Sequence, residues 1–374
     1  MLEHLLSRTD RSLLGRWWWT IDRWTFLCIF TLFIVGIFLS FSASPSVAHT
    51  IHLPTFYFVQ RHVIFTFLSL FLMVGVSLNN PNLIRLLCWL ILGTCIVMLM
   101  LTPIIGMEIK GARRWINLFG FSLQASEFVK PTFAVATAWL LSKHIDGPLS
   151  GRMLSVLLYA SILLLIIIQP DFGMAFVITG IWFFQFFLAG LPLMWVSVLS
   201  SVGLAGSIGA YFLFPHVASR VDRFLNPAAG DHFQIERSLQ AFRNGGWFGR
   251  GPGEGLVKKN LPDAHADFVF SVAGEEFGLF ACLFILGLFL FFILRGFYFA
   301  HKEHNSFLSL AISGLFFQIA LQAIVNISSS LHLIPTKGMT LPFLSYGGSS
   351  LLSIGLSAGI LLSFTKKRLD DKHI

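Results

Sequence analysis

Acidic side chains stand directly beside long apolar stretches of this sequence, where charges are costly and usually serve a function. The stretch LPDAHADFVF places Asp263, His265 and Asp267 just before an apolar run, and Glu275 and Glu276 follow inside that run. An aspartate in a partly desolvated cleft can take a proton from an attacking hydroxyl group. It can also cap the helix that follows, so spacing alone leaves base and cap open for Asp267.

The neighbours of Asp267 suggest supporting roles. We interpret Asp263 as a solvated loop acid and His265 as a residue that orients the turn. Glu275 and Glu276 lie about 100° apart around a helix. They therefore cannot both face one cavity, and at least one of them should pair with another helix.

Two further segments combine charges with apolar runs. In GARRWINLFGFSLQASEFVKP, Arg114 is a candidate cation, and the i, i+3 spacing of Glu127 and Lys130 allows a pair on one helix face. The alternative for that pair is a structural ion pair near the membrane interface. In QPDFG, Asp171 is expected to cap the following helix.

Two glycine-rich segments complete the set of candidates. SLQAFRNGGWFGRGPGEG predicts a short amphipathic helix, which contains Arg243, followed by a glycine-rich turn. It is not a phosphate-binding P-loop, because no Gly-Lys-Ser/Thr follows. PTKGMTLPFLSYGGSS places Lys337 between two prolines near the last apolar run. Irregular backbone at membrane depth is tolerated when it lines a cavity, so this segment indicates one.

Composition sets the class of protein that must position these residues. Of 374 residues, 55% are hydrophobic and 12% are charged, and the mean hydropathy is +0.77. Soluble domains carry about 25% charged residues. We predict an all-α polytopic membrane protein. The four cysteines all fall in apolar blocks and suggest neither disulfides nor a metal cluster.

The apolar blocks predict about ten transmembrane helices. We expect a cytoplasmic segment at 1–23, seven helices within 24–214, a large extracytoplasmic loop at 215–266, three helices within 267–364 and a cytoplasmic tail at 365–374. The expected spans are Trp24–Phe41, Val63–Leu78, Leu83–Ile105, Glu127–Leu141, Leu154–Ile168, Phe172–Leu191, Met194–Phe214, Phe268–Phe297, Phe307–Ser329 and Phe343–Phe364.

The distribution of Lys and Arg predicts that both termini face the cytoplasm. With that orientation, cytoplasmic segments hold 13 basic residues and the short outer loops hold 5, namely Arg61, Lys110, Arg113, Arg114 and Lys337. The basic outer residues could contact anionic lipid headgroups or an anionic ligand such as a phosphate. The sequence leaves both readings open at this point.

Taken in order, the motifs resemble those of the SEDS family, the shape, elongation, division and sporulation proteins of the bacterial envelope. The resemblance is carried by GARRWI, SEFVK, QPDFG, SLQAFRNGGWFG, LPDAHADFVF and PTKGMTLPF with SYGGSS, and it spans roughly residues 20–368. SLQAFRNGGWFG, the Ala264–His265 pair and PTKG resemble the FtsW division branch rather than RodA. Ala125 and Ala266 depart from the family pattern without removing an ionisable group.

The resemblance implies a peptidoglycan glycosyltransferase that polymerises lipid II at the outer face of the membrane and releases undecaprenyl diphosphate. It implies that Asp267 is the catalytic base. Lys130 and Arg114 are the favoured cations for the substrate, and Lys337 and Arg243 are weaker candidates. Catalysis at the outer face would require Asp267, Lys130 and the glycine-rich turn to meet one cavity. Whether a divalent cation, Mg²⁺ or Mn²⁺, bridges the diphosphate is left open, because no ligand spacing typical of a metal site is visible.

The resemblance also implies partners and a location. A class B penicillin-binding protein would crosslink the strands, its single span packing near the eighth and ninth spans, and other division-complex membrane proteins would assemble at the septum of the cytoplasmic membrane. No nucleic-acid partner is expected. Three alternatives remain: a lipid II flippase, a RodA-type elongation polymerase and a non-enzymatic scaffold. A flippase would need polar groups across the membrane depth.

Overall fold

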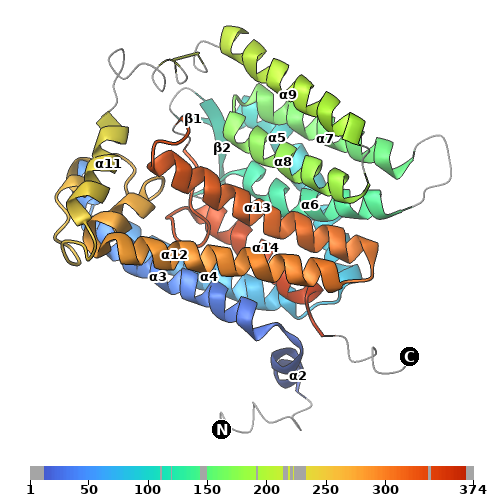
Figure 1. Ribbon diagram of the computed structural model, residues 1–374, viewed down its shortest axis with the longest axis horizontal. Helices are drawn as coiled ribbons and strands as arrows, with labels where there is room; N and C mark the ends of the chain where they lie inside the picture. Colours follow the sequence, from blue (N-terminus) through green and yellow to red (C-terminus); the bar gives the residue numbers. More distant parts are fainter. Residues whose placement is uncertain are drawn as a thin grey trace.

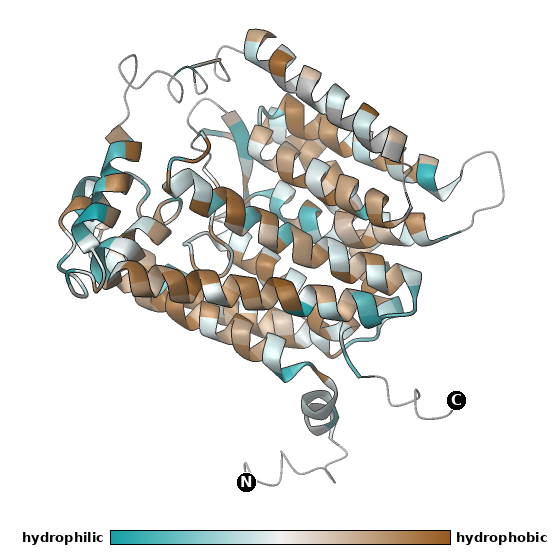
Figure 2. Ribbon diagram, viewed as in Figure 1, coloured by the Kyte–Doolittle hydropathy of each residue, from teal (hydrophilic) through white to brown (hydrophobic). Residues whose placement is uncertain are grey.

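The computed structural model describes residues 12–109, 112–118, 120–143, 150–190, 193–213, 218–219, 222, 233–335 and 338–367. Within these residues, helices run roughly side by side and are joined at two ends of the molecule (Figure 1). Their middle turns are apolar and their ends are more hydrophilic (Figure 2). This pattern is that of a multi-pass membrane protein, because the hydrocarbon core accepts apolar helices of this length.

Each of the ten predicted spans corresponds to a helix. Six of these helices are long and apolar enough to cross a membrane, and α8 and α14 are shorter apolar helices. The ten helices are α3 (Arg23–Thr50), α4 (Tyr57–Ser77), α5 (Pro81–Ile105), α6 (Ala125–Ser142), α7 (Gly151–Ile168), α8 (Phe172–Leu188), α9 (Leu193–Leu213), α12 (Val269–Lys302), α13 (Ser306–Ser330) and α14 (Gly348–Phe364). A short helix, α2 (Leu13–Thr20), precedes them.

Four span boundaries differ from the prediction by five residues or more. Helix α4 begins at Tyr57 rather than Val63. Helix α3 continues past the expected Phe41 to Thr50, and α12 continues past Phe297 to Lys302. Helix α14 begins at Gly348 rather than Phe343, because Phe343 has a positive φ of 67° that no α-helix accommodates. The residues before α14 therefore form an irregular, buried segment rather than a helical turn.

Helix α13 lies at the centre of the bundle, and 78% of its most apolar 18-residue stretch is buried. It packs against α6, α8 and α12. Helix α14 packs closely on α4, since a Cβ atom placed on Gly355 would lie 2.2 Å from the Ser69 hydroxyl. Small residues at such contacts let membrane helices approach one another.

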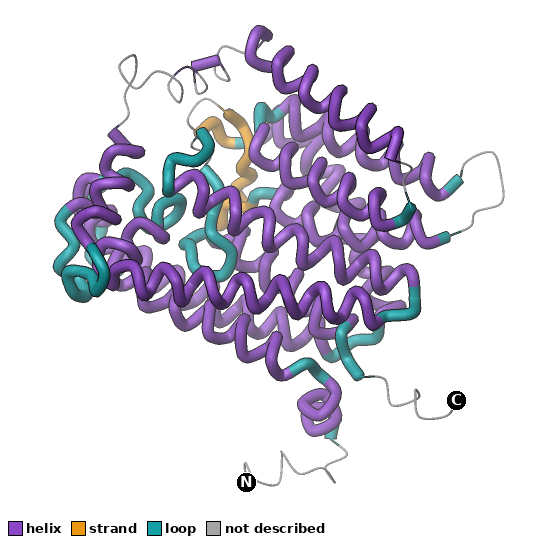
Figure 3. Tube along the Cα trace, in the orientation of Figure 1, coloured by secondary structure: helices purple, strands orange, loops and turns teal. Residues whose placement is uncertain are grey.

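A small antiparallel sheet, not predicted from the sequence, joins α5 to α6. Strands β1 (Met107–Ile109), β2 (Ala112–Leu118) and β3 (Phe121–Leu123) follow one another in sheet order, with Ile116 paired to Leu123. The sheet lies at the same end of the molecule as α11, beside several irregular segments (Figure 3). The expectation of an all-α fold therefore holds for the membrane-spanning part, and the outer connection adds strands.

The expected long loop contains regular structure in its described part. Helix α11 (Phe233–Gly245) confirms the short amphipathic helix predicted before the glycine-rich turn, and a 3₁₀ turn, η1, spans Val257–Asn260. Helix α11 packs against α12, and η1 packs against α11 and α3. They sit at the end of the bundle where α12 begins (Figure 1).

Candidate active site

A cavity of about 1000 Å³ opens at the end of the bundle that carries the sheet and α11. Its walls come from the start of α4, α6 and α8, from β2, from the turn before α12, from the end of α13 and from the irregular segment before α14. Its charged lining includes two arginines and several acids: Arg61, Arg114, Glu127, Asp171, Asp263 and Asp267. Segments far apart in the sequence thus converge on one polar cavity.

Asp267 is held by backbone contacts at this cavity. Its N–H donates to the Asp263 carbonyl at 2.9 Å, which closes the turn before α12. Asn326 of α13 donates from Nδ2 to the Asp267 carbonyl at 2.9 Å and to the Met339 carbonyl at 2.6 Å. A Cβ atom on Gly338 would lie 3.1 Å from Asp267 Oδ2, so the carboxyl group faces a residue without a side chain.

The capping alternative for Asp267 finds little support in this geometry. Phe268 occupies the N-cap position of α12, and no side-chain cap bond is made there. Asp267 is half-buried and lines the cavity. Its position suits a group that must meet a substrate.

Arg114 projects from β2 toward the turn between α7 and α8. Its guanidinium donates to the Gln169 carbonyl at 3.2 Å and to the Pro170 carbonyl, and it lies 3.9 Å from the Asp171 carboxylate. Asp171 also accepts from the N–H of Met174, which confirms its predicted role as the cap of α8. Arg114 is therefore both a wall of the cavity and an anchor of the sheet.

Lys130 lies behind the cavity rather than in it. Its side chain is 1% exposed, and Nζ donates to Glu127 Oε2 at 2.7 Å. Glu127 lines the cavity, whereas Lys130 is not among the lining residues of the described chain. The i, i+3 pair expected from the sequence is thus present, with its acidic member toward the cavity.

The two weaker cation candidates do not join this group. Arg243 is exposed in the last turn of α11 and is not among the cavity-lining residues of the described chain. Lys337 lies outside the described residues.

The glycine-rich turn, which we expected to meet the cavity, instead packs on α12. Glu275 accepts from the N–H groups of Leu256, Val257 and Lys258 at 2.8–3.1 Å. Glu276 accepts from the Gly253 N–H at 2.9 Å, from the Lys258 ammonium and from a serine hydroxyl of α3. Both carboxylates are buried, and neither is among the cavity-lining residues of the described chain. We call this arrangement the carboxylate clasp.

The sequence reasoning missed an aromatic wall on the other side of Asp267. Arg61 lies 4.6 Å over the Tyr57 ring and hydrogen-bonds the Tyr346 hydroxyl. The His265 ring lies 4.5 Å from Phe58 and 5.2 Å from Tyr346, and the His265 carbonyl accepts from the Tyr346 N–H at 2.9 Å. Burial lowers the pKa of His265 to about 4, partly offset by nearby Asp263. His265 is therefore neutral near pH 7, which fits the positioning role expected for it.

No three His, Cys, Asp or Glu side chains in the described part of the chain lie close enough together to form a metal site. The acids of the cavity instead have protein partners, such as Lys130 for Glu127 and Arg114 for Asp171. The cavity lining combines the Asp267 carboxylate with two arginines, Arg61 and Arg114, which suits proton transfer in the same cavity as an anionic group.

Comparison with known proteins gives the family. The model of a family described as "Cell cycle protein", which covers FtsW, RodA and SpoVE, matches residues 22–369. The chain belongs to this family. It is 44% identical over 367 residues to the probable peptidoglycan glycosyltransferase FtsW of Caulobacter vibrioides, covering 98% of this chain and 94% of that protein. The protein of the same name from Coxiella burnetii is 36% identical, covering 92% and 96%.

Solved structures of this family share the fold. A chain of a peptidoglycan synthase complex that coordinates polymerization and crosslinking is similar, with a TM-score of 0.77, 26% identity and coverage of 92% of this chain and 97% of that one. RodA of Thermus thermophilus, a rod shape determining protein, gives a TM-score of 0.70 at 26% identity, covering 93% and 97%. The relatives named FtsW agree with the division branch indicated by the sequence motifs.

Proposed function

We propose that this protein is the division-branch peptidoglycan glycosyltransferase, which polymerises lipid II at the outer face of the cytoplasmic membrane. One observation carries the assignment of the site: the Asp267 carboxyl group shares a polar cavity with Arg61 and Arg114. A transferase that expels a diphosphate needs a base for the acceptor and fixed cations for the leaving group. The names of the relatives support the same activity.

The reaction assigns a role to each group. A sugar hydroxyl of the acceptor attacks the anomeric carbon of the donor, and its proton passes to Asp267. The bond between that carbon and the diphosphate oxygen breaks, and undecaprenyl diphosphate leaves. Arg114 and Arg61 stabilise the growing negative charge. Lys130 acts through Glu127, whose carboxylate it holds at the cavity wall.

Loss of the base tests this proposal. Asp267→Asn keeps the size of the side chain but cannot accept the proton, so polymerisation should fall by about a hundredfold or more. The assay is polymerisation of purified lipid II by the purified protein, with and without its partner. Near-normal activity of Asp267→Asn would refute the base assignment, provided that the wild type is active.

A flippase is the second candidate because polar side chains continue into the membrane along α13. Gln318, Gln322 and Asn326 lie on one face of this helix and are buried, and Gln322 also lines the cavity. Polar groups through the membrane depth are what a transporter requires. Vesicles containing labelled lipid II distinguish the two candidates, because a flippase moves lipid across the bilayer and makes no glycan.

Orientation, location and partners belong to the same proposal. The basic-residue count supports cytoplasmic termini and an outward-facing cavity, and the division branch supports a septal location with other division-complex proteins. A class B penicillin-binding protein is the proposed transpeptidase partner, its span packing on α12 and α13. The related chain found in a synthase complex supports a partner of this kind. Cysteine crosslinking between the two proteins tests the contact.

A further inference from the structure

A second cavity lies at the opposite end of the bundle from Asp267. It has a volume of about 1230 Å³ and is bounded by the last turns of α6, α8 and α12, the first turn of α7 and the first half of α13. None of the residues assigned to the proposed reaction lines it. The proposed function therefore leaves this cavity without a role.

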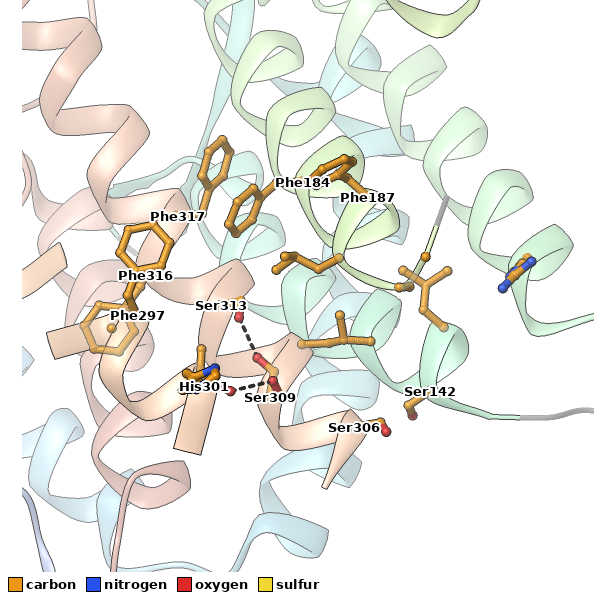
Figure 4. A pocket seen from close by; sticks show the side chains of 18 of the residues that line it. Ser142, Phe184, Phe187, Phe297, His301, Ser306, Ser309, Ser313, Phe316 and Phe317 are labelled. Atoms are coloured by element: carbon orange, nitrogen blue, oxygen red, sulfur yellow. Dashed lines mark hydrogen bonds between the residues drawn. The ribbon is translucent and has the colours of Figure 1, made fainter. Parts of the chain in front are cut away.

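The lining changes from polar to apolar along the cavity. Figure 4 shows the Ser142 and Ser306 hydroxyls at one end and the rings of Phe184, Phe187 and Phe317 toward the other. On α13, the lining runs from Ser306 to Ala320, which is roughly 21 Å at 1.5 Å of rise per residue. A small soluble ion would use only the polar end of such a groove, whereas an amphiphile would use its whole length.

The ionisable side chains at the mouth are all of the basic type. Lys143, Arg152 and His301 line the cavity, and no aspartate or glutamate of the described residues does so. All three side chains belong to exposed residues at helix ends. The Lys143 ammonium lies 4.4 Å over the ring of Trp139 in the same helix end. Basic pockets between membrane helices bind anionic lipid headgroups by this kind of complementarity.

Serine hydroxyl groups lie between the basic residues and the rings. Ser309 and Ser313 donate to backbone carbonyls of Ala300 and Ser309 within the cavity wall (Figure 4). Ser306 is exposed at the mouth. We propose that this cavity binds one anionic phospholipid of the leaflet opposite the Asp267 cavity, with its phosphate at Lys143, Arg152 and His301 and an acyl chain along α13.

The test uses the full-length protein in phosphatidylcholine nanodiscs that contain a small fraction of phosphatidylglycerol with a photoreactive acyl chain. Crosslinks should map to the phenylalanine-lined wall of α8 and α13. The double variant Lys143→Gln with Arg152→Gln should lower this crosslinking by about tenfold, and Ser306→Glu should lower it as well by repulsion. Lys302→Gln is the control. It removes a positive charge at the same end of the bundle, but Lys302 does not line the cavity, so crosslinking should be unchanged.

Three outcomes overturn the proposal. If photoreactive phosphatidylcholine labels the cavity equally well, or if the charge variants are labelled as strongly as the wild type, the groove is a general apolar surface. Protection by millimolar inorganic phosphate means a site for a free anion. Displacement of the lipid by the membrane span of the partner, with crosslinks moving to that span, means a protein-docking groove. Lipid II polymerisation by each variant reports that it is folded, so failure of the lipid site is distinguishable from failure of the proposed function.

Discussion

The pKa of His265, at the cavity wall, depends on the aromatic residues that surround its ring. Because Phe58 and Tyr346 bury the ring, the folded protein resists protonating it, whereas the unfolded chain binds a proton near pH 6.5. Between these two pKa values the unfolded state holds more protons than the folded state. Stability contributed by neutral His265 is therefore present above pH 6.5 and is lost as the pH falls toward 4.

We expect the thermal unfolding midpoint of the wild-type protein to fall between pH 7 and pH 5. His265→Phe keeps an aromatic ring between Phe58 and Tyr346 but cannot take up a proton. Its midpoint should change less over the same range, as measured by thermal unfolding in one detergent at several pH values. Identical pH slopes for the two proteins would show that His265 does not contribute.

The buried pair of Lys130 and Glu127 gives a second prediction. Lys130→Met leaves an unpaired carboxylate, which costs about 3–5 kcal/mol for a buried pair and should lower the amount of folded protein. Adding Glu127→Gln removes the stranded charge and should restore the folded amount. We expect polymerisation by the double variant to stay about tenfold or more below that of the wild type, because the charged pair at the cavity wall is lost. Full recovery of polymerisation in the double variant would mean that the pair is only structural.

At the scale of elements, the carboxylate clasp fixes the glycine-rich turn to α12. The turn and α12 approach so closely that a Cβ on Gly249 would lie 2.1 Å from the Glu276 carbonyl oxygen. Gly278 interrupts α12 with φ 74° and ψ −169°, and a Cβ there would lie 2.4 Å from the Gly249 nitrogen. Glycine is needed at both positions, since each combines a positive φ with backbone contact.

Gly278→Ala should therefore destabilise the protein by roughly 2 kcal/mol or more through strain and overlap. Gly287→Ala, in the same helix with open space around it, is the matched control and should be neutral or slightly stabilising. The unfolding midpoints of the two variants provide the measurement. Equal midpoints would contradict the close packing of the turn on α12.

The helices were predictable because each apolar block has the length of a membrane span and its ends carry charges or turn residues. The sheet was not, because two of its strands have three residues and its attachment depends on Ser349 of α14, which bonds to Ser122 and Gln124. Arg61 was counted only as an outer basic residue, since its contacts with Tyr57 and Tyr346 are not visible in the sequence. The prediction that the glycine-rich turn meets the cavity was wrong. The turn instead binds the carboxylates of α12, which lie about 20 positions further along the chain, so the sequence does not reveal the pairing.

For the whole molecule, orientation decides whether the Asp267 cavity faces the lipid II of the outer leaflet. Gly249 and Ser345 are poor positions for a labelling test of orientation, because Gly249 is packed against α12 and Ser345 is buried. Phe248 is 82% exposed at the end of the molecule near the clasp, and His304 is exposed between α12 and α13 at the other end. The four native cysteines are buried and should give little background.

A membrane-impermeant thiol reagent should label Phe248→Cys on spheroplasts, whose cytoplasmic membrane is intact. His304→Cys should react only after the membrane is permeabilised, because the basic-residue count places that end in the cytoplasm. Labelling is read as the fraction of protein modified. The reverse pattern would place the Asp267 cavity inside the cell and exclude the proposed polymerase reaction there.

The side-chain amide of Asn326 links α13 to two backbone segments of the cavity. One side chain of α13 holds the backbone carbonyls of both Asp267 and Met339, while Arg114 is tied to the turn between α7 and α8. A small slide of α13 against α8 would therefore carry the proposed base, Asp267, and the Gly338 segment together and leave Arg114 in place. The distance between Asp267 and Arg114 would then depend on the position of α13 along its axis. A neighbouring protein that shifts α13 would in that case change the polymerisation rate without contacting the substrate.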